Sequence, residues 1–146
     1  MNTINHALWG ATIGRFVGLP IEGAIVGASP DVFTLPSFTF YKLVKHIESQ
    51  DSPKILINIY STLHNWFFGA GLTAILYFIN PRLGVLGVAY LIHIFEDAFL
   101  HTDMATRFLY PIWKGKIKVY SANDHKWVQI LDFIIIILVN VFYFKI

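Results

Sequence analysis

The sequence predicts an all-α fold, a small polytopic membrane helix bundle with three full spans and two N-terminal half-helices. Hydrophobic residues make up 55% of the chain and charged residues only 14%, against roughly 25% charged residues in ordinary globular proteins. Three segments are long and apolar, which a soluble core in a chain of 146 residues does not explain: 55–79, 83–102 and 127–144. We therefore expect one integral membrane domain over residues 1–146.

The N-terminal third predicts two short helical pieces. Residues 6–18 are apolar apart from Arg15, Pro20 interrupts the pattern, and residues 21–28 form the second piece. Each piece is too short to cross hydrocarbon, so we expect two half-helices packed against the bundle, where protein covers their polar backbone. Glycines at a four-residue spacing in the first piece favour close contact with another helix: Gly10, Gly14 and Gly18.

The rest of the chain predicts a hairpin of two spans and then a third span. Residues 55–79 carry no formal charge, and this length at about 1.5 Å per residue exceeds the roughly 30 Å thickness of the hydrocarbon. Residues 80–82 connect this span to the second one, at residues 83–102, so the two are antiparallel. Residues 127–144 form the third span, with an isoleucine-rich centre.

Two basic stretches flank the hairpin, at residues 32–54 and 103–126, whereas the connection between its spans carries only Arg82. By the positive-inside rule, both basic stretches face the cytoplasm and Arg82 faces the other side. This agrees with a hairpin, whose two ends emerge on one side of the membrane. We expect an integral membrane protein whose two basic stretches lie in the cytoplasm.

Charge and composition exclude several classes of function. The net charge of +2 is small and the basic residues form no stripe, which argues against nucleic-acid binding. The absence of cysteine excludes disulfides, thiolate zinc sites, iron–sulfur clusters and a cysteine nucleophile. The N-terminus has no basic region, and Arg15 interrupts the apolar stretch that follows, so no cleaved signal peptide is expected.

Ionisable side chains inside the spans are the candidates for function, because each costs at least ~2.5–3.5 kcal/mol at the membrane centre. His93 and Asp97 lie four residues apart and share a helix face. His64, in the preceding span, lies about 13 Å from the cytoplasmic end, at the same depth as His93. Two imidazoles and a carboxylate at matched depth are ligands that zinc uses, and an open coordination position would make the site catalytic.

The remaining polar residues have less specific interpretations. A single histidine in a span can be satisfied by a backbone or hydroxyl group, and this alternative stays open for His64. Glu96 points to a different side of the helix from Asp97 and is either an outer partner of the ligands or a base. His46 and His125 fall in the basic stretches and are expected to be solvated.

Four patches occur in order over residues 5–113, about three quarters of the chain: Asn5-His6-Ala7, then Gly27-Ala28-Ser29-Pro30-Asp31, then His64, and last His93-x-x-x-Asp97-Ala98-Phe99-Leu100-His101 followed by Leu109-Tyr110-Pro111. In this order they resemble the membrane-bound metal-dependent hydrolases, which include the LexA-regulated inner-membrane proteins. That family is distantly similar to zinc-dependent phospholipase C, in which histidines and aspartates occur in the same order around clustered zinc ions.

The resemblance implies that the protein lies in a prokaryotic cytoplasmic (inner) membrane. It also implies a divalent metal, with zinc favoured, bound as one or two ions. The ligands it implies are His6, Asp31, His64, His93 and Asp97, with His101 as a further candidate. Asp97 would be placed to bridge two ions. Asp31 or Glu96 would serve as the general base where the metal leaves it unoccupied.

The chain departs from the family pattern around His64. Relatives show His-Arg-x-x-Thr-His-Ser, whereas this sequence has Tyr60-Ser61-Thr62-Leu63-His64-Asn65, without the first histidine, the arginine and the serine. If that arginine steadies an anionic substrate in relatives, another cation must do so here. Arg15 and Arg107 are the candidates.

The resulting hypothesis is a membrane-embedded metal-dependent hydrolase that acts on a phosphoester or similar bond of a membrane lipid or amphiphile. Two alternatives stay open. Two depth-matched histidines also suit a bis-histidine haem-binding membrane protein. The missing arginine and serine favour a non-catalytic membrane adaptor that has retained the fold.

Overall fold

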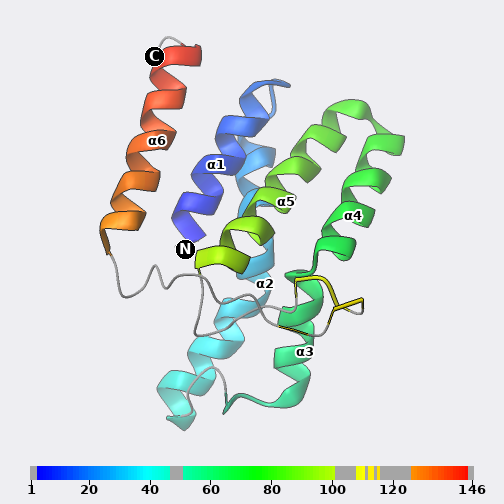
Figure 1. The fold of residues 1–146 in the computed structure, drawn as a ribbon, viewed down its shortest axis with the longest axis vertical. Helices are drawn as coiled ribbons and strands as arrows, with labels where there is room; N and C mark the ends of the chain where they lie inside the picture. Colours follow the sequence, from blue (N-terminus) through cyan, green and yellow to red (C-terminus); the bar gives the residue numbers. More distant parts are fainter. Residues whose placement is uncertain are drawn as a thin grey trace.

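The computed structural model describes residues 3–46, 51–100, 108–110, 112–113, 115 and 126–144, and within these residues it contains helices and no strands. The prediction of an all-α fold is therefore confirmed. The helices, shown in Figure 1, are α1 (Thr3–Arg15), α2 (Pro20–Lys45), α3 (Lys54–Leu63), α4 (Trp66–Ile79), α5 (Pro81–Leu100) and α6 (Lys126–Phe144).

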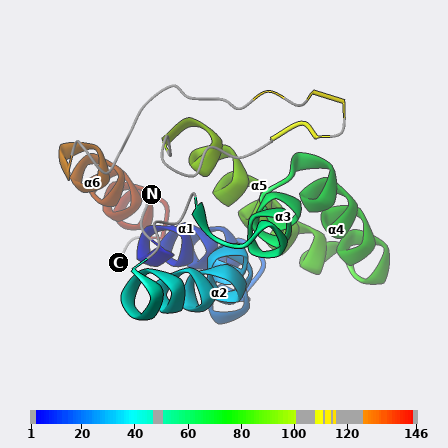
Figure 2. The ribbon, with the colours of Figure 1, turned by 90° about the horizontal axis from the view of Figure 1, so that it is seen from below.

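Helix α1 occupies the middle of the arrangement. It packs along α2 in a close hairpin, and α5 and α6 also pack against it. Helix α4 forms a second hairpin with α5, and α3 leads into α4. Seen from below in Figure 2, α6 and α4 lie at opposite edges of the molecule, with α1, α2 and α5 between them.

The α1–α2 hairpin depends on glycine. A Cβ at Gly10 would collide with the carbonyl oxygen of Gly23, and one at Gly27 would lie 2.6 Å from the carbonyl oxygen of His6. The close packing expected at Gly10 is confirmed, and it brings His6 next to the middle of α2. Gly18 differs from the prediction: nothing lies within 4 Å of its Cβ position, and its φ of +74° forms the turn between the helices.

Helix α2 differs from the prediction because it runs unbroken through Pro30. The prediction of a short half-helix at residues 21–28 is therefore wrong. The basic stretch expected to begin at residue 32 is also helical as far as Lys45. Pro30 has no N–H to donate to the carbonyl oxygen of Val26, and this oxygen instead accepts the hydroxyl of Ser29 at 2.8 Å. The side-chain bond replaces the backbone bond that proline removes, so the helix continues.

The span predicted over residues 55–79 is interrupted, so the expectation of one continuous helix is wrong. Helices α3 and α4 are instead joined at His64 and Asn65. Asn65 caps α4, because its Oδ1 accepts the backbone N–H of Phe67 at 2.9 Å and that of Phe68 at 3.3 Å. The interruption places His64 at a junction in the interior.

The second and third predicted spans correspond to α5 and α6, whose bounds differ from the predicted ones by at most two residues. Within the described residues, α6 is the one helix that is both long and apolar enough to cross a membrane. Helix α4 is apolar but has 14 residues. The basic stretch expected at residues 103–126 lies mostly outside the described residues.

Candidate metal centre

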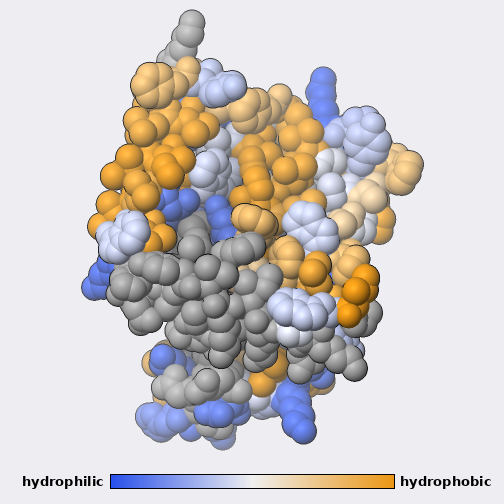
Figure 3. All heavy atoms as spheres, in the orientation of Figure 1, coloured by the Kyte–Doolittle hydropathy of each residue, from blue (hydrophilic) through white to orange (hydrophobic). Residues whose placement is uncertain are grey.

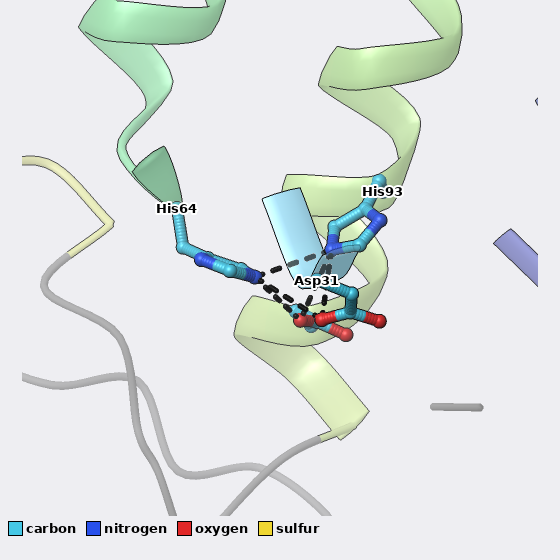
Figure 4. A group of neighbouring side chains, drawn as sticks. Asp31, His64 and His93 are labelled. Atoms are coloured by element: carbon cyan, nitrogen blue, oxygen red, sulfur yellow. Dashed lines mark hydrogen bonds and ion pairs between the residues drawn. The ribbon is translucent and has the colours of Figure 1, made fainter. Parts of the chain in front are cut away.

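Five of the predicted site residues meet in the interior, although they come from four separate parts of the chain. Helix α1 supplies His6, α2 supplies Asp31, the α3–α4 junction supplies His64, and α5 supplies His93 and Asp97. Their side chains are buried, and the most exposed, that of Asp31, is 10% exposed. In Figure 4, the rings of His64 and His93 and the carboxylate of Asp31 point toward one another.

Backbone carbonyl groups orient two of the histidines. Nδ1 of His93 lies 2.7 Å from the carbonyl oxygen of Gly27, and Nδ1 of His64 lies 3.0 Å from that of Tyr60. A carbonyl oxygen only accepts hydrogen bonds, so Nδ1 carries the hydrogen in both rings. In a neutral imidazole this leaves a lone pair on Nε2, and the two Nε2 atoms lie 3.2 Å apart.

Ring stacking restricts the same two histidines. Tyr60 stacks on His64 with the ring centroids 3.9 Å apart, and His6 stacks on His93 with the centroids 3.7 Å apart. Each ring is therefore held both at its edge, by a carbonyl group, and on its face. Neither Nε2 can turn away without breaking packed contacts.

Two carboxylates complete the group. Oδ2 of Asp97 lies 3.3 Å from Nε2 of His64 and 3.4 Å from Nε2 of His93. Oδ1 of Asp31 lies 3.6 Å and 3.7 Å from the same two nitrogens. The four ligand atoms all lie within 4.8 Å of one another, and we call these residues the four-residue cluster. Its nitrogen and oxygen atoms are of the kind and spacing that can hold a metal ion.

His6 lies beside this cluster in a different role. Its Nε2 lies 3.0 Å from Oδ1 of Asp97, and its Nδ1 lies 3.1 Å from Oε2 of Glu96. Because both partners are carboxylate oxygens, the ring donates from both nitrogens only when it carries both hydrogens and a positive charge. His6 therefore orients Asp97, and Glu96 in turn orients His6, as an outer partner of the ligands.

Asp31 is also oriented from outside the cluster. Its Oδ2 accepts a hydrogen bond from the hydroxyl of Thr3 at 2.7 Å, which leaves Oδ1 facing the two histidines. Its side chain is 10% exposed and that of Glu96 is 15% exposed, whereas those of His64 and Asp97 are almost fully buried. The site is therefore most accessible from the side of these two carboxylates.

Sequence reasoning missed three residues that support the site: Thr3, Gly27 and Tyr60. Gly27 and Tyr60 contribute backbone carbonyl groups, and the identity of a residue does not show what its carbonyl group will bind. A spacing signal existed for each, because Gly27 precedes Asp31 by four residues and Tyr60 precedes His64 by four, on the same helix face. Thr3 lies three residues before His6, again one helical turn away.

Other predicted candidates lie elsewhere. His101, Arg107 and His125 fall outside the described residues. Arg15 lies nine residues from His6 along α1, about 13 Å away, and its guanidinium lies over the ring of Phe144 at 5.4 Å. It is therefore not brought to the cluster. His46 is exposed at the end of α2, as expected.

Comparison with known proteins adds no further constraint. No family model, curated protein or solved structure matches this chain. The four-residue cluster and its surroundings are therefore the basis for the proposed function.

Proposed function

We propose that the protein is a membrane-embedded, metal-dependent hydrolase whose ion is held by Asp31, His64, His93 and Asp97. The observation that carries this proposal is the convergence of four lone-pair atoms in a buried space. Facing lone pairs repel one another unless a metal ion or a proton lies between them. Two carboxylates taken out of water cost several kcal/mol each when no positive charge compensates them. His6 offsets part of the carboxylate charge when its ring is charged, and a divalent ion would supply the rest.

The spacing of the cluster favours zinc. Ligand atoms placed tetrahedrally at about 2.0–2.2 Å from zinc would be separated from one another by about 3.3–3.6 Å. The separations that involve a histidine nitrogen run from 3.2 to 3.7 Å, and all four ligand atoms lie within 4.8 Å of one another. The Nδ1 bonds to backbone carbonyl groups match the outer hydrogen bonds that fix the tautomer of metal-binding histidines. The resemblance to membrane-bound metal-dependent hydrolases is part of the same proposal.

Membrane placement is supported by the distribution of side chains, because polar side chains make up an unusually large part of the buried core. The largest fully buried side chains include His6, His64, His93 and Asp97. Large apolar side chains instead lie outside, and Figure 3 shows them over α6 and over the α4–α5 hairpin. Soluble monomers rarely expose contiguous apolar patches of more than a few hundred Å². Surrounding lipid would cover this surface.

Helix lengths allow more than one crossing, whereas α6 alone among the described helices is also apolar enough by composition. Helix α2 has 26 residues, about 39 Å, and α3 with α4 has 24, about 36 Å, against roughly 30 Å of hydrocarbon. Basic residues lie at the ends of these elements: Lys42 and Lys45 at one end of α2, Lys54 at the start of α3, and Arg82 after α4. We therefore propose a polytopic arrangement with the lysine end in the cytoplasm.

The chemistry proposed for the site is hydrolysis of a phosphoester in a lipid or similar amphiphile. A divalent ion in the cluster would lower the pKa of a bound water toward 7 and stabilise charge on the substrate oxygens. Asp31 is the ligand suited to leave the ion, because it is the most exposed of the four side chains and Thr3 holds its other oxygen. Its departure would open a position for the attacking water, and the freed carboxylate oxygen would accept the proton of that water. His6 keeps Asp97 in place through the reaction.

One observation favours a second candidate, a non-catalytic membrane adaptor. Four protein ligands close a tetrahedral shell, and closed shells are typical of structural zinc sites. Asp31 decides between the two, because its movement would open a position for water. The haem alternative fits less well: a haem iron needs its two imidazoles on opposite faces of a porphyrin, whereas His64 and His93 converge beside two carboxylates.

The test is the metal content and turnover of purified protein. Wild type should hold one divalent ion per chain, zinc in zinc-replete medium, and should hydrolyse at least one member of a phospholipid and phosphoester screen. His93→Ala and Asp97→Ala should lose the ion, because each opens the shell, while His46→Ala should keep it. Metal-free wild type from metal-replete buffer refutes the proposal, and bound metal without any turnover favours the adaptor.

A further inference from the structure

The α4–α5 hairpin carries an apolar groove of about 550 Å³ that takes no part in the four-residue cluster. Its lining includes Ala70 and Ala74 of α4 and Gly84 and Val88 of α5. These small side chains leave the space above the two helices open. His93 follows Val88 by five residues, about 140° around the helix at ~100° per residue. The groove and the metal centre therefore lie on different faces of α5.

Close packing beneath the groove fixes its shape. A Cβ at Gly84 would lie 2.7 Å from the Cβ of Tyr77, and one at Gly87 would lie 2.6 Å from the hydroxyl oxygen of Thr73. The two helices cannot move closer, and no larger side chain fits between them at these positions. The groove is therefore formed before any ligand binds.

The length of the groove matches one leaflet of a bilayer. It extends along α5 from Pro81 to Leu91. Ten residues of helix are about 15 Å long, and half of a hydrocarbon layer of ~30 Å is also about 15 Å. In the topology proposed above, Pro81 lies at the membrane surface, so the groove ends near the middle of the bilayer. One acyl chain of one leaflet has this reach.

A cation lies next to the surface end of the groove, one residue beyond Pro81 and outside the groove lining. Arg82 follows Pro81 directly, is exposed, and makes no ion pair within the described part of the chain. Its backbone N–H donates to Oδ1 of Asn80 at 2.9 Å, which orders the connection between the helices. A guanidinium at the headgroup level attracts a lipid phosphate and can bind two of its oxygens at once.

We propose that this groove binds one acyl chain of an anionic phospholipid whose phosphate contacts Arg82. The inference rests on the membrane placement in the proposed function and concerns a lipid bound apart from the metal centre. A second copy of the chain fits less well as the occupant. Two copies joined symmetrically through this face would bring their Arg82 side chains toward each other without a counter-charge.

The experiment is native mass spectrometry of the full chain in detergent with equal amounts of phosphatidylglycerol and phosphatidylcholine. Wild type should retain one phosphatidylglycerol with about fivefold preference, the factor equivalent to the ~1 kcal/mol of one basic residue at a membrane surface. Arg82→Gln should abolish the preference. Val88→Trp should fill the groove and abolish retention of both lipids. Val141→Trp is the matched control, since Val141 on α6 is 44% exposed and Val88 is 42% exposed.

The inference is overturned by no preference in wild type, by an unchanged preference in Arg82→Gln, by wild-type retention in Val88→Trp, or by a dimer that Val88→Trp dissociates. The zinc content of the same samples shows whether only the lipid-binding inference has failed or whether the proposed metal-dependent function has failed as well. Protein that holds zinc but no phosphatidylglycerol keeps the metal centre and refutes the groove. Protein that stays monodisperse without detergent refutes the membrane placement and, with it, the lipid site.

Discussion

Histidine has two distinct roles within a few ångströms in this protein, and hydrogen-bond partners alone separate them. His64 and His93 donate from Nδ1 to carbonyl groups and present Nε2 as a lone pair. His6 faces carboxylates with both nitrogens and so acts as a donor. The sequence indicates these residues because ionisable side chains are rare in apolar segments. It cannot distinguish the roles, because backbone carbonyl groups from distant positions determine them.

Substitution of Asp31 provides the most direct single-residue test of the proposed metal centre. Its Oδ1 lies farther from the histidine nitrogens than Oδ2 of Asp97 does, and it is the more exposed carboxylate. Asp31→Asn keeps the volume and one ligand oxygen but removes the charge and the capacity to accept a proton. We expect the variant to fold, to keep part of its metal and to lose turnover by about 10²–10⁴-fold, the usual contribution of a general base.

Three measurements on one preparation check this expectation: zinc stoichiometry, melting temperature in detergent and turnover of the substrate found for wild type. His46→Ala is the control, because His46 is exposed at the end of α2 and lies outside the site. If Asp31→Asn turns over at the wild-type rate, Asp31 is a spectator and Glu96, the other partly exposed carboxylate, becomes the candidate base.

At the scale of helices, the sequence predicts α5 and α6 well and α2 and α3 poorly. Long, mostly apolar runs bounded by polar residues define α5 and α6, although α5 contains Glu96 and Asp97. The helix expected at residues 21–28 continues through Pro30, because the Ser29 hydroxyl satisfies the carbonyl group that proline leaves free. The interruption before α4 comes from Asn65, a good N-cap residue that hydropathy does not weigh. Single side-chain bonds, which periodicity cannot detect, decide both cases.

The α1–α2 contact couples helix packing to the metal centre through Gly27. Its missing Cβ allows the approach of His6, and its carbonyl oxygen accepts Nδ1 of His93. Gly27→Ala places a methyl group 2.6 Å from the His6 carbonyl oxygen, which should destabilise the protein by about 1–3 kcal/mol, as overpacking does. The same shift should weaken zinc binding.

Gly71 offers a matched control within α4. Nothing lies within 4 Å of its Cβ position, so Gly71→Ala only replaces a helix-interior glycine and should stabilise by up to about 1 kcal/mol. Melting temperatures in detergent and zinc titrations of both variants check the pair. Equal effects of the two substitutions would show that Gly27 has no special position in the packing.

At the scale of the whole molecule, the composition already indicates that the fold must gather its few ionisable residues in the interior. With 14% charged residues, the chain cannot cover itself with polar groups, and the few ionisable residues inside its apolar segments need one another or a metal. The fold brings α1, α2, the α3–α4 junction and α5 together at one level, so that their polar residues meet in the interior. The apolar surface that remains outside then faces lipid in the proposed arrangement.

The cysteine-free sequence allows this arrangement to be tested with single introduced thiols. Arg82→Cys should react with a membrane-impermeant maleimide on intact cells, because the proposed topology places the α4–α5 connection outside. Lys45→Cys, at the C-terminal end of α2, lies on the cytoplasmic side in the same topology and should react only after the membrane is opened. Ile134→Cys, 45% exposed in the middle of α6, should react in neither case, because lipid excludes both water and the reagent. Labelling of Ile134→Cys to the same extent as Lys45→Cys after opening would place that surface in water and refute the membrane placement.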